Sequence, residues 1–127
     1  MNPKEHRIES ATVRLIDNGI IENMIHDHQE LCVPELLEIK SLNTQLSGGK
    51  PYAVLVNSGQ LTTITKAGRE LSASKEFVQN TVAKALLVKS VGHRIVGQFY
   101  LRVNKPHVST KLFGKRDEAI DWLRTQL

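Results

Sequence analysis

The 127-residue sequence has one cysteine, few aromatic residues and no long apolar run. Because Cys32 has no second thiol to pair with, the chain forms no internal disulfide, and we expect a protein of the reducing cytoplasm. No apolar stretch approaches the roughly 18 residues that a membrane-spanning helix needs. The first ten residues, MNPKEHRIES, contain no apolar segment after their charges, so we expect no secretory signal.

The common sequence signatures of enzymes are also missing. The chain contains no Gly-x-Ser-x-Gly elbow, no His-Glu-x-x-His and no carboxylate pair in apolar surroundings. A nucleophilic Cys32 would need a histidine base beside it, and nothing in the sequence marks one. We therefore expect no catalytic residues, no enzymatic activity and no cofactor.

The stretch HDHQELC, residues 26–32, gathers residue types that bind metals. A metal site needs three or four converging ligands, and the remaining histidines, His6, His93 and His107, are scattered along the chain. The stretch also lies between an expected strand and an expected helix, where polar residues are ordinary. We therefore expect no metal site.

The stretch LSGGKPYAVLVN, residues 46–57, places Gly-Gly-Lys beside an apolar run. A phosphate-binding P-loop runs from a strand through a glycine-rich loop into a helix, and a hydroxyl residue follows its lysine. Here a helical pattern precedes the glycines, and Pro51 follows Lys50. We interpret Gly48 and Gly49 as the end of a helix and the apolar run as a buried strand.

Charge is distributed unevenly along the chain. Residues 1–64 hold five basic and eight acidic residues, whereas residues 65–127 hold twelve basic and five acidic ones. A basic half favours an anionic partner, although lysines dispersed over solvated helices give the same count. Because Phe99 and Trp122 fall on or beside apolar helical stripes, they are poor platforms for stacking bases, and we expect no nucleic-acid binding.

Turn signals and hydrophobic periodicity predict the element order β-β-α-β-α-β-α-β-α in one domain. Asp17-Asn18-Gly19 between two apolar runs is typical of a hairpin turn. Alternation of strands and helices after a hairpin indicates an α/β sheet with mostly parallel inner strands. The expected strands cover residues 11–16, 20–25, 51–57, 83–90 and 108–113. The expected helices cover residues 34–46, 91–104 and 115–127, and residues 64–80 are expected to form one or two short helices, because Gly68 and Ser72 weaken the middle.

The helix expected over residues 91–104 carries an apolar stripe that is predicted to face the core. Tyr100 and Leu101 fall off this stripe. If they are exposed, they form an apolar patch suited to a partner, and we hypothesise a homodimer through such a patch; if they face the sheet, the stripe is only wider. The stripe consists of Val91, Ile95, Phe99 and Val103.

From Leu46 to the C-terminus the chain resembles the STAS group of domains, which have the SpoIIAA-like, or anti-sigma-factor-antagonist, fold. The resemblance is greatest to an uncharacterised bacterial branch of that group. It implies one STAS-like domain over residues 1–127, with a mixed sheet of about five strands that begins with a hairpin and about four helices packed mainly on one face. The resembling segments are LSGGKPYAVLVN, TKAGREL, AKALLVKS, GQFYLRVNKP and KLF…DEAIDWL.

The resemblance implies a small, non-enzymatic, cytoplasmic protein that acts in signalling by binding a protein partner. In regulatory members a partner kinase phosphorylates a serine within the pattern Ile-Asp-Ser-Ser-Gly. Residues 64–68 read Ile-Thr-Lys-Ala-Gly, so Lys66 occupies the phosphoacceptor position and the usual switch is predicted to be lost. The candidate interaction or switch residues are Thr63, Thr65, Lys66 and Gly68.

Other interpretations of the same segment stay open. Thr63 or Thr65 could take over phosphorylation, and their hydroxyls could hold an anion at the helix start together with Lys66. Capping of the helix by one of these threonines explains them without a ligand. The fold is also akin to lipid-binding domains, so the alternative function is a small-ligand (lipid or nucleotide) binding protein with an apolar pocket beside the sheet.

Overall fold

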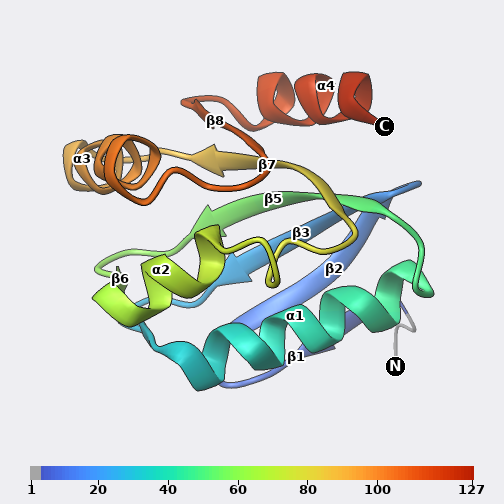
Figure 1. Cartoon of the computed structure of the whole chain (residues 1–127), viewed down its shortest axis with the longest axis horizontal. Coiled ribbons are helices and arrows are strands. Elements are labelled where there is room, and N and C mark those ends of the chain that lie inside the picture. Colours follow the sequence, from blue (N-terminus) through green and yellow to red (C-terminus); the bar gives the residue numbers. More distant parts are fainter. Residues whose placement is uncertain (1–3) are drawn as a thin grey trace.

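A mixed sheet of six strands forms the centre of the computed structural model, which describes residues 4–127 (Figure 1). Residues 1–3, the start of the segment in which no secretory signal is expected, lie outside this range. The strands are β1 (Glu5–Arg7), β2 (Ala11–Asp17), β3 (Ile20–Ile25), β5 (Tyr52–Ser58), β7 (Thr81–Leu87) and β8 (Ser109–Phe113). They follow this order in space, the first three antiparallel and the last four parallel, which confirms a mixed α/β sheet that begins with a hairpin.

Helices cover both faces of this sheet. The first three lie on one face, and the last packs on the opposite face against β5, β7 and β8 (Figure 1). None of the helices in residues 4–127 is long and apolar enough to cross a membrane. The helices are α1 (Val33–Ser47), α2 (Lys66–Ala73), α3 (Val91–Phe99), its continuation as the π-helix η1 (Tyr100–Asn104), and α4 (Arg116–Gln126).

Glycines mark two corners that the sequence predicts. Gly19 adopts φ 80° in the turn between β2 and β3, where a side chain would be strained. Gly48 and Gly49 follow α1 with φ 64° and 78°, and their N–H groups donate to carbonyls of its last turn. This is a left-handed helix end, and β5 begins after it. The Gly-Gly-Lys stretch is therefore a helix-to-strand corner and not a P-loop.

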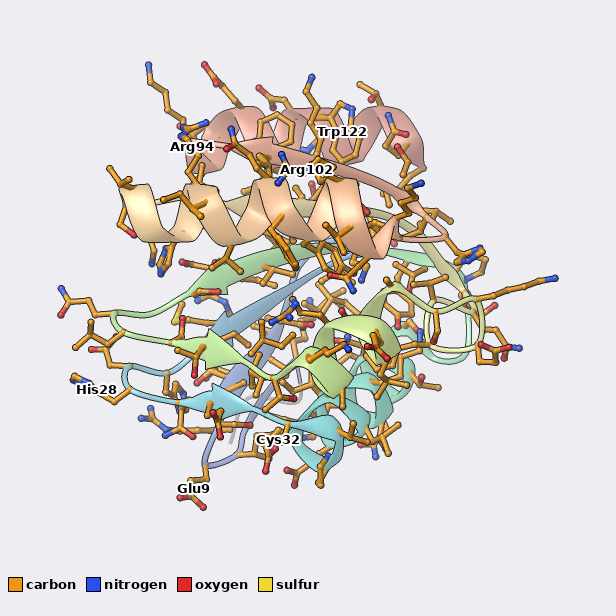
Figure 2. The ribbon with its side chains drawn as sticks, turned by 60° about the vertical axis from the view of Figure 1, so that its left-hand side comes forward. Glu9, His28, Cys32, Arg94, Arg102 and Trp122 are labelled. Carbon is orange, nitrogen blue, oxygen red and sulfur yellow. The ribbon has the colours of Figure 1, made fainter. Side chains whose placement is uncertain are left out.

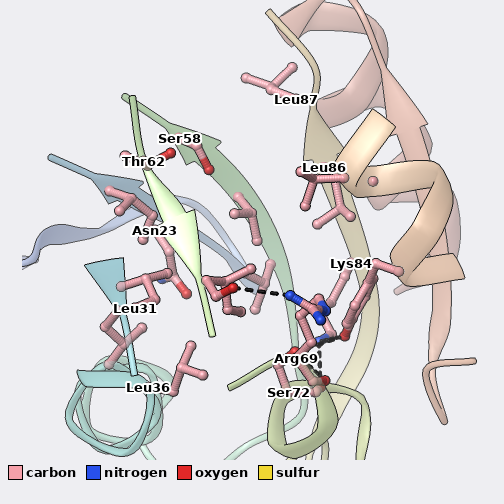
Figure 3. Close-up of a pocket in the computed structure, with 18 of the residues that line it drawn as sticks. Asn23, Leu31, Leu36, Ser58, Thr62, Arg69, Ser72, Lys84, Leu86 and Leu87 are labelled. Carbon is pink, nitrogen blue, oxygen red and sulfur yellow. Dashed lines mark hydrogen bonds between the residues drawn. The ribbon is translucent and has the colours of Figure 1, made fainter. Parts of the chain in front are cut away.

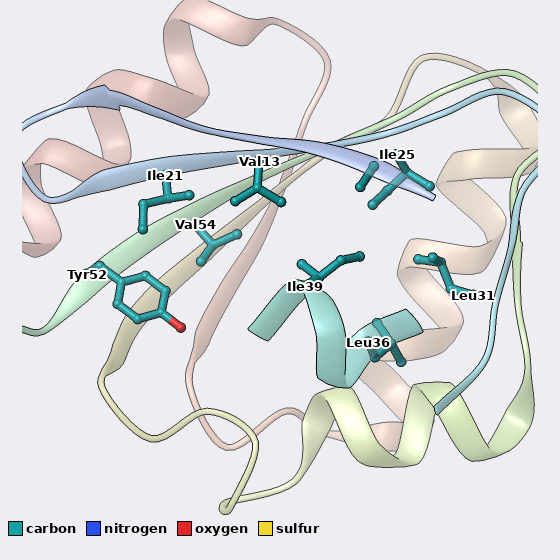
Figure 4. Close-up of a cluster of buried hydrophobic side chains, with 9 residues drawn as sticks. Val13, Ile21, Ile25, Leu31, Leu36, Ile39, Tyr52 and Val54 are labelled. Carbon is teal, nitrogen blue, oxygen red and sulfur yellow. The ribbon is translucent and has the colours of Figure 1, made fainter. Parts of the chain in front are cut away.

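The central strands are buried on both faces, as the apolar run of β5 predicts. Tyr52 and Val54 face α1, whereas Ala53 and Leu55 face α4. The α1 side of the core contains Ala11, Val13, Ile21, Ile25, Leu31, Leu36, Ile39, Tyr52 and Val54 (Figure 4). The α4 side contains Ile20, Ala53, Leu55, Ala83, Ala85, Leu87, Ala119, Ile120 and Leu123.

Three short strands are absent from the prediction. One is β1, which extends the hairpin side of the sheet. The other two, β4 (Glu30–Leu31) and β6 (Thr63–Ile64), form a separate two-stranded parallel pair. Strands of two or three residues are too short for an alternating pattern to reveal. The β4–β6 pair matters for the site because α1 and α2 start immediately after these strands and are thereby held side by side.

The predicted burial of the α3 stripe is wrong. Val91, Ile95 and Val103 are 77%, 61% and 52% exposed, whereas Tyr100 is buried. The helix meets β8 through Gly97, where an added Cβ would lie 2.8 Å from a methyl group of Leu112. The helix face that carries Gly97 and Tyr100 therefore packs on the sheet. The four-residue apolar period therefore marks the outer face of α3.

Candidate functional site

A partly open cavity of about 350 Å³ lies between the sheet and the helices α1, α2 and α3. It exists because α1 packs on β2 and β3, and α3 packs on β8, while the eight-residue α2 packs chiefly against α1 and η1. Helix α2 therefore lies across the helix-covered faces of β5 and β7 without packing closely on them, and the space between is the cavity. The surface exposed to the cavity is mostly apolar, and the apolar side chains that line it are Ile25, Leu31, Leu36, Ile39, Val54, Val56, Ile64, Phe77, Leu86, Leu87, Val88 and Val96.

Lys84 brings an amino group into this apolar space from the middle of β7 (Figure 3). The side chain is buried, and its Nζ donates to the backbone carbonyl of Ser72 at 2.7 Å and to the hydroxyl of Tyr100 at 3.0 Å. Burial, with a smaller contribution from the charge of Lys40, lowers the pKa of Lys84 to about 7. Both of its acceptors are neutral, so the ammonium form has no counterion.

Tyr100 is the first residue of η1, and the wider π turn sets its side chain toward the cavity. Its hydroxyl also lies 3.1 Å from the hydroxyl of Ser72 on α2. Burial raises the pKa of Tyr100. At this C-terminal end of α3, Tyr100 joins η1, α2 and β7 through one polar cluster.

Arg69 enters the cavity from α2 (Figure 3). One guanidinium nitrogen, Nη1, donates to the carbonyl of Ile64 at 3.1 Å, and the group lies 5.2 Å from the ring of Phe99. The Nε atom is buried and has no hydrogen-bond partner. Because a guanidinium has five N–H groups, Arg69 keeps donors available for a bound molecule.

Lys40 of α1 provides a third cation at the edge of the cavity. Its Nζ donates to the hydroxyl of Tyr52 at 2.7 Å, to the carbonyl of Gln79 at 2.7 Å and to the hydroxyl of Thr81 at 3.1 Å. Burial lowers the pKa of Lys40 to about 8. All three ammonium protons are engaged, which distinguishes Lys40 from Lys84.

The charge around the cavity has one sign. Lys40, Arg69 and Lys84 line it, and none of the lining residues within the described chain is aspartate or glutamate. None of the three forms an ion pair with a carboxylate of residues 4–127. An apolar cavity with uncompensated positive charge is electrostatically suited to an anionic group.

Glu22 shows how a charge is accommodated on the opposite face of the sheet. Its buried carboxylate accepts hydrogen bonds from Arg14 at 2.8 Å, Arg116 at 3.0 Å and Asn57 at 3.0 Å. Burial alone would raise the pKa of Glu22, but the bonds from Arg116, Arg14 and Asn57 hold it below its usual value. This buried charge is paired twice, in contrast to Lys84.

The predicted switch residues meet at the start of α2, beside the cavity. Thr65 caps the helix, because its hydroxyl accepts the N–H of Gly68 at 3.0 Å. Gly68 lies so close to β4 that an added Cβ would be 2.9 Å from the carbonyl of Leu31. Lys66 is exposed and pairs with Glu70, whereas Thr63 of β6 lines the cavity. Capping and packing therefore engage Thr65 and Gly68, whereas the side chains of Lys66 and Thr63 are exposed.

The HDHQELC stretch is built into the surface around β4 (Figure 2). His26 bonds to the hydroxyl of Thr12, and Asp27 accepts the N–H of Gln60. Within residues 4–127 no three histidine, cysteine, aspartate or glutamate side chains converge as metal ligands do. Desolvation and nearby carboxylates raise the pKa of the Cys32 thiol, which is the reverse of nucleophile activation.

The polar cluster of Ser72, Lys84, Tyr100 and Arg69 is missing from the sequence-based candidates. One signal for it is in the printed sequence. In AKALL, residues 83–87, a lysine occupies a position between small and apolar residues of a strand that is buried on both faces. A lysine at such a position is rarely fully buried unless its charge has a partner. The partners of Lys84 come from distant segments, so only the fold reveals them.

Comparison with known proteins identifies the fold and the family. A family model described as "Domain of unknown function (DUF7793)" matches residues 14–127. Among solved structures, an uncharacterized protein from the DUF3478 family with a SpoIIAA-like fold, from Shewanella loihica PV-4, is 10% identical with a TM-score of 0.57. The similarity covers 94% of this chain and 89% of that chain, and it confirms the SpoIIAA-like (STAS-like) fold. Comparison with curated proteins gives no match.

Proposed function

The chain belongs to the DUF7793 family of domains of unknown function, and we propose that it is a non-enzymatic binding protein that holds a small apolar molecule in the cavity beside its sheet. The observation that carries the proposal is the cavity itself. At about 350 Å³ it lies at the lower end of the range of ligand pockets, roughly 300–1,000 Å³. A closely packed domain leaves few voids larger than a water molecule, so a space of this size calls for an occupant.

The lining favours binding of a lipid-like molecule over catalysis or nucleotide binding. General acid–base chemistry commonly pairs a base with a second polar group that orients it. The cavity brings together two lysines, an arginine, two tyrosines and His93, but no carboxylate or thiol among the described lining residues, and within those residues the buried Nδ1 of His93 has no hydrogen-bond partner that orients the ring. A nucleotide needs many polar contacts, whereas the surface exposed to this cavity is mostly apolar. These features support the small-ligand alternative that the sequence left open.

Two leucine variants test the proposal. Leu86→Trp places a large ring in the cavity from the half-buried side of β7, whereas Leu37→Trp places the same ring on the outer face of α1, where Leu37 is 52% exposed. We expect native mass spectrometry to find a co-purified apolar molecule in the wild type and in Leu37→Trp but not in Leu86→Trp. An environment-sensitive fluorophore that binds all three proteins equally would overturn the proposal.

A second function, protein–protein interaction, is favoured by the outer face of α3. The stripe of Val91, Ile95 and Phe99 is exposed, and α3–η1 carries Arg94 and Arg102 but no acidic residue (Figure 2). Exposed apolar side chains beside charges of one sign fit a protein partner with an apolar patch and an acidic rim. A cytoplasmic location and a signalling role, with Lys66 and Thr63 in the same contact surface, remain predictions.

Variant-specific capture tests this second function. We expect Ile95→Ser to abolish capture of an acidic protein from cells of the natural host, and Leu37→Ser, an exposed apolar change on α1, to retain it. If the captured protein is a second copy of this chain, the partner is not an acidic protein and the chain forms a homodimer. If the wild type binds anionic lipid vesicles and Ile95→Ser does not, this surface binds a membrane, and the proposal of a protein partner is wrong.

A further inference from the structure

We propose that the ligand of the cavity is an apolar carboxylic acid, whose carboxylate binds to Lys84 and Arg69 and whose chain lies along the aliphatic lining. The inference rests on the proposed function and names the class of ligand. It is carried by the position of two side-chain cations that share one apolar cavity and lack a carboxylate partner.

The first step concerns the charge of Lys84. An ammonium group in an apolar interior is costly unless an opposite charge lies beside it. Lys84 donates hydrogen bonds to the carbonyl of Ser72 and the hydroxyl of Tyr100 and lies over the rings of Phe77 and Tyr100, and all of these groups are neutral. On the other face of the sheet, the buried carboxylate of Glu22 forms salt bridges with two arginines, Arg14 and Arg116. A carboxylate that enters from outside therefore completes an ion pair with Lys84 and holds it in its ammonium form.

The second step concerns the donors that remain. Lys84 uses two of its three protons, and the side chain of Arg69 uses one of its five N–H groups in a hydrogen bond to the Ile64 carbonyl. The Nε of Arg69 is buried and has no hydrogen-bond partner, and buried N–H groups normally have one. A carboxylate has two oxygens and accepts from a guanidinium and an ammonium together.

The third step concerns the shape of the polar region. Lys84 projects from β7 and Arg69 from α2, so the two groups approach the cavity from its sheet side and its helix side (Figure 3). Lys40 is already saturated by Tyr52, Gln79 and Thr81. The free donors are therefore those of Lys84 and Arg69, and a carboxylate is the smallest anionic head that accepts from both, so the head group is compared with a phosphate in the experiment below.

The fourth step concerns the chain of the ligand. Beyond the polar cluster the cavity continues between α1 and the carboxyl ends of the parallel strands, a usual place for ligands in α/β folds. Its walls there are aliphatic, so each methylene that enters gains about 0.8 kcal/mol by leaving water. The surface offered to the chain includes Ile25, Leu31, Leu36, Ile39, Val54 and Val56.

A matched set of ligands and variants tests the inference. Dodecanoic acid, dodecanol and dodecyl phosphate carry the same chain with different heads, and calorimetry gives the dissociation constant of each. We expect the wild type to bind the acid at least about tenfold more tightly than the alcohol, a difference that one ion pair readily provides. Lys84→Met and Arg69→Met should each remove most of this preference by weakening binding of the acid far more than binding of dodecanol, and Lys75→Met, a change at an exposed lysine outside the cavity, should retain the preference.

The outcomes separate this inference from the proposed function. Equal affinity for the acid and the alcohol would overturn the carboxylate site and leave the proposed apolar binding function intact. Tighter binding of dodecyl phosphate would overturn the carboxylate as the preferred head. If none of the three compounds binds to the wild type, both the inference and the binding of apolar chains are wrong. Circular dichroism of each variant shows whether a loss reflects unfolding.

Discussion

The amino group of Lys84 lies 3.0 Å from the hydroxyl of Tyr100, and this hydrogen bond links the sheet to the π-helix η1 across the cavity. The backbone carbonyl of Ser72, 2.7 Å from the same amino group, adds α2 to the link. Three elements that are separate along the chain therefore meet at one buried nitrogen. The stability of this end of the cavity should depend on that nitrogen and its charge.

Removal of the hydroxyl in Tyr100→Phe should lower the free energy of unfolding by about 1–2 kcal/mol, because Lys84 loses one of its two acceptors in an apolar environment. Urea denaturation measures the change. In a Lys84→Met background the same substitution should cost much less, since the amino group that needs the hydroxyl is gone. Equal costs in the two backgrounds would show that the hydrogen bond contributes little.

Lys84→Met should flatten the pH dependence of stability between pH 7 and 9. Burial lowers the pKa of Lys84 to about 7 from 10.5, so in this window the unfolded chain keeps a proton that the folded protein has released. Because the unfolded state binds more protons, stability rises with pH, by up to roughly 1.4 kcal/mol per pH unit for one group. Denaturation midpoints at several pH values measure the slope.

The control for the pH experiment is Lys75→Met, a change at an exposed lysine. Other groups that face Lys84 are Lys40 from α1, Arg69 from α2, and Tyr100 from η1. Lys40, with a pKa lowered to about 8, adds a slope of the same sign. The wild type and Lys75→Met should therefore show a steep rise, and Lys84→Met a shallower one. An unchanged slope in Lys84→Met would mean that its amino group is solvated.

The sequence predicts the fold well because its signals are local. Asn18-Gly19, the glycines after α1 and the apolar run of β5 each specify their own structure, and the long elements lie near their predicted places, except that α2 ends at Ala73 although the sequence predicts helical structure to residue 80. The orientation of α3 is not a local property. It depends on how closely Gly97 approaches β8, so an apolar period on the outer face is mistaken for the inner one. The cavity is equally invisible, because it results from the packing of α2 on its neighbouring helices.

Glu22→Gln should destabilise the protein by about 2–4 kcal/mol, because it leaves Arg14 and Arg116 without the carboxylate between them. The hydrogen bonds hold the pKa of Glu22 below its usual value, so the stability it contributes is present at neutral pH and is lost as pH falls through that lowered pKa. The exposed Asp17–Arg124 pair gives the control. Asp17→Asn should change the urea midpoint far less, and equal effects would contradict the buried network.

Thr65→Ala should cost about 1 kcal/mol of stability, because the Thr65 hydroxyl caps α2 through the N–H of Gly68. Thr63→Ala should change stability little, since Thr63 is exposed in the two-residue strand β6. Thermal melting compares the two variants. Thr63→Glu therefore mimics phosphorylation at Thr63 while the Thr65 cap stays intact. Mass spectrometry of protein from the natural host tests directly whether either threonine is phosphorylated. A phosphate found on Thr65 would contradict a purely structural role for that residue.

The outer face of α3 should be dispensable for folding. Because Ile95 is 61% exposed, Ile95→Ser should change the free energy of unfolding by no more than about 0.5 kcal/mol. Light scattering of the wild type at high micromolar concentration should give the monomer mass, since a symmetric pairing of this face would bring Arg94 and Arg102 of two copies together without an acidic residue from α3–η1. A dimer mass that returns to the monomer mass in Ile95→Ser would contradict this expectation and establish a second copy as the partner.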